Sequence, residues 1–126
     1  MSEYFNHVSR RQLIETTRAL LIFCRSHDRS TGLGPIEDCL MGLDKNNFPG
    51  AFKCFKRVPF GGMGTFPDWI PPVKFPNENP EYVSVVFTAL YREWARLMTV
   101  AAGEKRNDNR RTRLYLLRLL RRKFLG

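Results

Sequence analysis

Residues 79–103, NPEYVSVVFTALYREWARLMTVAAG, carry the strongest helical signal in the chain. Asn79 is a favourable N-cap, Pro80 suits the first helical position, and Glu81 complements the helix dipole. The apolar residues that follow share an arc of about 120° at ~100° per residue. They are Val83, Val86, Phe87, Leu90, Trp94, Leu97, Met98 and Ala101. With Gly103 as a favourable cap at the C-terminal end, the pattern predicts a helix over 80–102 at the centre of the core.

Two helices are expected in the first third of the chain. Ser9 and Gln12 have the spacing of a capping box, and the apolar period that follows predicts a helix over 10–26. Pro35 then opens a second helix as its first helical residue. Gly42 is the expected end of this second helix.

Two more helical segments complete the expected fold. A third helix over 48–57 has Ala51, Phe52 and Phe55 as its apolar face. A basic helix over about 110–124 ends the chain. The expectation is therefore a single all-α domain over 1–126, a compact bundle of about five helices.

Composition narrows the class of protein. The chain has 126 residues, of which 43% are hydrophobic, so it can build a core and is not expected to be disordered. No apolar run approaches the ~20 residues that cross a bilayer, and the N-terminus lacks a signal-peptide pattern. The three cysteines are Cys24, Cys39 and Cys54. Their odd number does not fit a disulfide framework, and their spacing does not fit a zinc site. The cysteines are therefore predicted to be reduced thiols that bind no metal, which indicates a cytoplasmic protein.

Residues 59–80 form a long segment between the third and fourth helices. It contains six prolines, three glycines and the large aromatics Phe60, Phe66, Trp69 and Phe75. Loops of this length in compact domains are uncommon and often functional. The aromatics predict that this Gly/Pro-rich loop packs across the bundle.

Four side chains of this loop are candidate partner-binding residues: Met63, Phe66, Asp68 and Trp69. The glycines around Met63 either permit a tight turn that lets Met63 and Phe66 reach the core, or form a nest for an anion. Asp68 is a general base, an interface carboxylate or an Asx-turn residue. Trp69 is an interface anchor if it is exposed and a core residue if it is buried.

No catalytic constellation is expected. His27 with Asp28, or Cys24 with His27, would need a third group that the sequence does not identify. The chain is therefore predicted to be no enzyme and to use no cofactor.

The positive charge is concentrated at the C-terminal end. Residues 104–126 hold nine basic and two acidic residues, whereas residues 1–103 hold twelve basic and ten acidic ones. Arg111, Arg118, Arg121 and Arg122 gather on one face of the expected last helix. This face suits an acidic protein, a nucleic acid or a membrane surface, and a basic helix that is merely solvated is the simplest alternative.

The run Val58-Pro59-Phe60-Gly61-Gly62-Met63-Gly64-Thr65-Phe66-Pro67-Asp68-Trp69 resembles the signature of a family of small uncharacterised bacterial proteins. Their shared segment reads Gly-Gly-Met-Gly, a small residue, Phe, any residue, Asp. The resemblance is specific over about 58–83, with Pro67 where family members often have Asn. It implies, by analogy with small proteins of this kind, an immunity protein that neutralises a toxin.

The leading functional hypothesis is thus a non-enzymatic protein-binding module, an immunity protein for a cognate bacterial toxin with an acidic face. The alternative is a nucleic-acid-binding protein that uses the basic helix over 110–124. Aromatic residues for RNA stacking are scarce in that segment, which ranks the alternative second.

Overall fold

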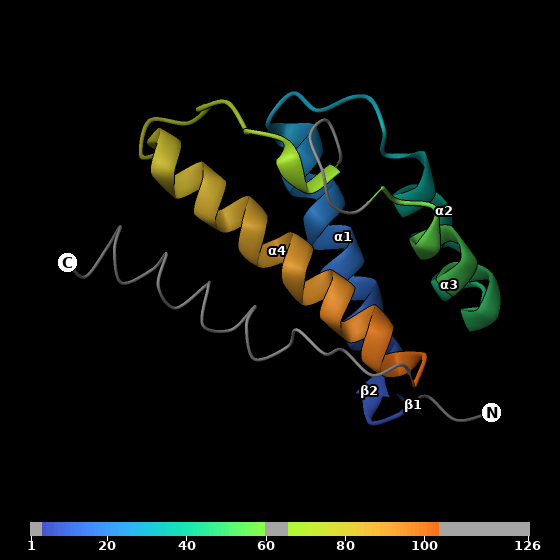
Figure 1. The fold of residues 1–126 in the computed structure, drawn as a ribbon. Coiled ribbons are helices and arrows are strands. Elements are labelled where there is room, and N and C mark those ends of the chain that lie inside the picture. Colours follow the sequence, from blue (N-terminus) through green and yellow to red (C-terminus); the bar gives the residue numbers. More distant parts are fainter. Residues whose placement is uncertain (1–3, 60–65, 104–126) are drawn as a thin grey trace.

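The computed structural model describes residues 4–59 and 66–103 (Figure 1). In this part of the chain it contains four α-helices, a short 3₁₀ helix and one small hairpin. The all-α class is confirmed. The predicted fifth helix over 110–124 lies outside the described residues.

The first helix, α1, covers Arg10–Ser26 and confirms the expected bounds. The Ser9 hydroxyl accepts from the backbone N–H of Gln12 at 3.0 Å, and the Gln12 side chain accepts from the Ser9 N–H at 2.9 Å. Both halves of the predicted capping box are therefore formed.

A small hairpin that the sequence analysis missed precedes α1. Strand β1 (Tyr4–Phe5) pairs antiparallel with β2 (Val8–Ser9). Asn6 and His7 between them have φ values of 51° and 71°, the left-handed pair that a type I′ turn requires. The Asn6 amide donates to the carbonyl oxygen of Ala101 at 2.8 Å, which ties the hairpin to the end of the fourth helix.

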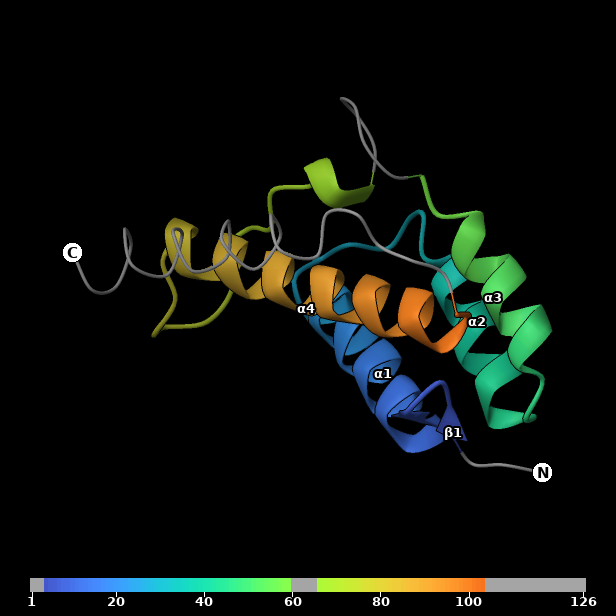
Figure 2. The same cartoon turned by 60° about the horizontal axis from the view of Figure 1, so that its bottom comes forward.

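Helices α2 (Gly34–Asp44) and α3 (Phe48–Lys56) form a close pair beside α1 (Figures 1 and 2). The expected end of α2 at Gly42 is wrong, because the helix continues to Asp44. Arg10 explains the extension: its guanidinium donates to the carbonyls of Leu43 and Asp44 at 2.8 and 2.7 Å, which satisfies the last turn. Gly42 instead permits close packing, since a Cβ there would lie 3.0 Å from the backbone nitrogen of Ala51.

Helix α4 (Pro80–Ala101) confirms the strongest sequence signal, with the Asn79 side chain accepting from the Tyr82 N–H at 2.9 Å. Gly103 has a φ of +78°, as a left-handed C-terminal cap requires. The buried arc is rotated and wider than expected. Val86 and Leu90 are half-buried, whereas Val85, Tyr91 and Ala95 are buried.

The two longest helices run in opposite directions against each other (Figures 1 and 2). The C-terminal end of α1 therefore meets the start of α4, where the long loop arrives. Trp94, the largest fully buried side chain, stands edge-on to Phe55 with ring centroids 5.1 Å apart and so links α4 to α3. None of the described helices is long and apolar enough to span a bilayer.

Candidate functional site

The described part of the loop begins with a 3₁₀ turn, Phe66–Asp68, that is fastened to the core. Phe66 is 2% exposed and packs edge-on against Phe87 at a centroid distance of 5.5 Å. Trp69 is half-buried, stands perpendicular to Phe87 at 5.0 Å and also meets Phe23 at 6.4 Å. The start of this segment is thus held by aromatic contacts to both α1 and α4.

Arg29 covers these two aromatic side chains from the end of α1. Its guanidinium carbon lies 4.5 Å from the centre of the Phe66 ring and 5.1 Å from that of Trp69. Burial lowers the pKa of Arg29, and the nearby Cys24 opposes that shift. The cation–π contacts add a second fastening to the same turn.

Glu78 organises the other end of the segment. Its Oε1 accepts from the backbone N–H groups of Lys74 and Phe75, each at 3.1 Å. Its Oε2 lies 2.8 Å from Nε2 of His27, a residue that is 3% exposed. One carboxylate therefore fixes two loop amides and the end of α1.

The ring of His27 is enclosed by protein. Phe23 stacks on it at 4.0 Å, and Phe75 stands edge-on to it at 5.5 Å. Nδ1 lies 2.9 Å from the carbonyl oxygen of Phe23 and 3.0 Å from the hydroxyl oxygen of Ser26. With both ring nitrogens close to polar protein groups and two aromatic rings against it, this histidine fastens the loop to the end of α1.

Electrostatics strengthen the same contact. Burial raises the pKa of the Glu78 carboxyl, but the hydrogen bonds from His27, Lys74 and Phe75 lower it by more, so the pKa falls below its ordinary value. Lys74 also forms an ion pair of 2.8 Å with Asp28, which again joins the loop to the residues after α1.

Between these fastenings the loop carries apolar side chains outward. Ile70 is 79% exposed, Phe75 is 50% exposed and Val73 is 43% exposed. Tyr82, in the first turn of α4, is 41% exposed. We call Ile70, Val73 and Phe75 the loop apolar surface.

The predicted partner-binding residues divide into three groups. Phe66 lies in the core, and the turn predicted to let it reach the interior lies outside the described residues. Trp69 is half-buried and Asp68 is exposed on the 3₁₀ turn. The remaining five lie outside the described residues: Met63, Arg111, Arg118, Arg121 and Arg122.

The sequence analysis missed Ile70, Val73 and Glu78 as residues of this site. Glu78 lies next to the N-cap of α4, a position that could have marked it as a residue that joins the loop to the helix. Its partner His27 is 51 positions away, so spacing gives no sign of their contact. Ile70 and Val73 flank a Pro-Pro pair, where an apolar side chain has no periodic pattern to reveal it.

The cysteines differ in their surroundings. Cys24 and Cys39 are buried and free, and Cys54 is free and half-buried. Burial raises the pKa of Cys24 to about 11 and that of Cys39 to about 12. The described residues hold no cluster of three or more His, Cys, Asp or Glu side chains that could bind a metal ion.

Comparison with known proteins gave no match: no family model, no curated protein and no solved structure corresponds to this chain. The family resemblance over 58–83 therefore stays a prediction.

Proposed function

We propose that this chain is a non-enzymatic protein-binding module and that the loop apolar surface is its contact surface. The observation that carries the proposal is the contrast within one short segment. Phe66 and Glu78 are fastened to the helices, whereas Ile70 and Val73 face outward, and Phe75 contacts His27 yet leaves half of its surface exposed.

This contrast matters because exposed apolar side chains on an anchored loop are suited to binding. Ordering an interface loop opposes association, and a loop that is already fixed in the free protein avoids most of that cost. A few side chains that become fully desolvated near the centre of an interface also carry most of its binding energy. The loop apolar surface has the required chemistry and the required support.

The finer proposal concerns the partner. We propose an immunity protein that neutralises a bacterial toxin with an acidic face. The resemblance over 58–83 supports the class, and the surplus of basic residues in 104–126 supports an acidic partner.

Affinity capture from the native host tests the contact surface. The bait is the tagged full chain, compared with the double variant Ile70→Asp/Val73→Asp. Ile22→Asp is the matched control, because Ile22 is a 58% exposed isoleucine on α1. A partner that the wild type and the control recover, and the double variant loses, supports the proposal. Equal recovery by all three baits contradicts it.

The toxin proposal needs a second experiment with the captured protein. The captured partner, expressed alone in a sensitive strain, should stop the growth of that strain. Co-expression of the wild type should restore growth, and co-expression of the double variant should not. A captured protein that leaves growth unchanged argues against a toxin while leaving the protein-binding proposal in place.

Nucleic-acid binding is the alternative function, supported by the net charge of residues 104–126. Phosphate contacts through Arg111, Arg118, Arg121 and Arg122 would make the affinity fall steeply with salt. Labelled DNA and RNA should then bind the wild type at low salt and fail to bind the variant with all four arginines changed to Glu. Absence of binding by the wild type at low salt would exclude this function.

A further inference from the structure

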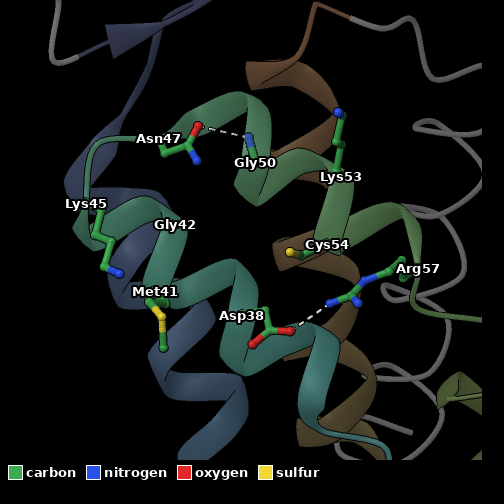
Figure 3. A pocket seen from close by; sticks show the side chains of 9 residues that line it. All are labelled: Asp38, Met41, Gly42, Lys45, Asn47, Gly50, Lys53, Cys54 and Arg57. Atoms are coloured by element: carbon green, nitrogen blue, oxygen red, sulfur yellow. Dashed lines mark hydrogen bonds and ion pairs between the residues drawn. The ribbon is translucent and has the colours of Figure 1, made fainter.

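The α2–α3 pair carries a second surface feature, a hollow of about 530 Å³ that is open to solvent (Figure 3). We call it the α2–α3 hollow. Met41 and Gly42 contribute from α2, and Gly50 and Cys54 contribute from α3. Gly42 lets the two helices approach closely beneath the hollow, because a Cβ there would lie 3.0 Å from the backbone nitrogen of Ala51.

The wall of the hollow is apolar and its edge is basic. Met41, 53% exposed, and the half-buried Cys54 supply apolar contact area. Lys45, Lys53 and Arg57 also line the hollow, with Asp38 as its single carboxylate. The lining therefore has three cations against one anion.

The lysines are the available cations. Arg57 forms an ion pair of 2.8 Å with Asp38, drawn as a dashed line in Figure 3. Lys45 and Lys53 are exposed and make no ion pair within the described parts of the chain. In Figure 3 they come from opposite sides of the hollow, Lys45 from the turn after α2 and Lys53 from α3.

We propose that the α2–α3 hollow binds an acidic segment of a partner protein, with an apolar side chain against Met41 and Cys54 and flanking carboxylates beside Lys45 and Lys53. The volume is within the range of about 300–1,000 Å³ that ligand sites occupy. Charge complementarity selects the acidic flanks. This inference rests on the proposed protein-binding function, because its occupant belongs to a protein partner.

The lining also distinguishes a protein segment from a nucleic acid. Proteins that bind single strands stack the bases on aromatic side chains. None of the described residues that line the hollow is aromatic. An aliphatic side chain needs no such platform, so the hollow favours an acidic peptide over an oligonucleotide.

Cys54 provides a direct readout in the whole 126-residue chain. The probe is the peptide acetyl-Glu-Asp-Leu-Asp-Glu-amide, and the measurement is the rate at which iodoacetamide alkylates Cys54, followed by mass spectrometry. The protection factor is the ratio of the rates without and with peptide. The methyl signal of Met41 reports binding independently by NMR.

The expected result is protection of Cys54 and a shift of the Met41 methyl signal by the acidic peptide. The variant Lys45→Glu/Lys53→Glu should weaken peptide binding by up to about fivefold for each ion pair that it removes, since an exposed ion pair contributes no more than about that factor. The control Arg11→Glu/Arg18→Glu changes the net charge equally at residues that do not line the hollow, and it should bind as the wild type does.

Three outcomes would overturn the inference. One is an unprotected Cys54 with an unshifted Met41 at the highest soluble peptide concentration. Another is that acetyl-Lys-Lys-Leu-Lys-Lys-amide protects Cys54 as well as the acidic peptide does. The third is that oligothymidylate protects Cys54 better than the acidic peptide does. The assay contains no partner protein and leaves Ile70 and Val73 unchanged, so its failure is distinguishable from failure of the loop apolar surface.

Discussion

Nε2 of His27 and Oε2 of Glu78 lie 2.8 Å apart, and through this contact the end of α1 holds the last loop residue before the cap of α4. Oε1 of the same carboxylate accepts from the backbone N–H groups of Lys74 and Phe75, each at 3.1 Å. The loop is thus fixed to the bundle through one carboxylate that contacts the buried ring of His27 and two loop amides.

Glu78→Gln should destabilise the protein in a pH-dependent manner. The amide keeps the shape and an acceptor for the loop N–H groups but removes the charge. The pKa of Glu78 is lower in the folded protein than its ordinary value of about 4.3. The ionised carboxylate of Glu78 therefore stabilises the fold fully above this ordinary value. That stabilisation is lost as the pH falls through the lower pKa of the folded protein.

Urea unfolding of the wild type and Glu78→Gln from about pH 7 into the acid range checks this prediction. The difference in the free energy of unfolding should be largest near neutral pH and should shrink on acidification. A difference that stays constant across the range would show that the charge of Glu78 does not support the loop.

Gly42→Ala should destabilise the α2–α3 pair by about 1–3 kcal/mol, the usual cost of overpacking. The added Cβ would lie 3.0–3.1 Å from N, Cα and Cβ of Ala51, and backbone atoms cannot move aside as a flexible side chain can. Gly34→Ala is the matched control, because a Cβ at Gly34 meets nothing within 4 Å. Urea unfolding should show a loss for Gly42→Ala and, for Gly34→Ala, no loss or a gain of up to about 1 kcal/mol.

Cys54 should be the most reactive of the three thiols in the native protein. At about pH 8, a thiol with a pKa of about 11 is a thiolate roughly one time in a thousand, so Cys24 reacts slowly and Cys39, with a pKa of about 12, more slowly still. Alkylation followed by peptide mapping should find Cys54 modified first, and all three modified in urea. Early modification of Cys39 would contradict its burial.

The helices could be predicted from the sequence because their signals are local. Ser9, Asn79 and Gly103 act within a few residues of their own positions, and the apolar period of 80–101 repeats every turn. The end of α2 was predicted wrongly because the group that satisfies it, Arg10, comes from a distant part of the chain. A capping contact of this kind leaves no trace in the local pattern.

The site was predicted in outline only. Its aromatic and proline content identified the loop as important, but the sequence could not separate its anchors from its exposed residues. Phe66 and Ile70 are both large apolar residues of one irregular segment, and one is buried while the other is exposed. That difference depends on where Phe87, Arg29 and His27 meet the loop, which is decided by the packing of α1 on α4.

This division between anchor and contact residues leads to the last prediction, which separates stability from binding. Phe66→Ala removes a buried ring that packs against Phe87 and lies under Arg29, and it should cost about 3–5 kcal/mol. Ile70→Ala removes a side chain that is 79% exposed and should change the free energy of unfolding by no more than about 0.5 kcal/mol. Urea unfolding measures both values.

The variant that loses little stability, Ile70→Ala, should nevertheless lose affinity for the captured partner. Ile70→Ala should weaken binding by about fivefold or more, because interface anchors lose at least about 1 kcal/mol on truncation, although its fold is intact. If Ile70→Ala binds as tightly as the wild type, the exposed side chain contributes nothing to recognition. If instead it unfolds as readily as Phe66→Ala, Ile70 is an anchor of the loop, and the contact surface must be sought elsewhere on the molecule.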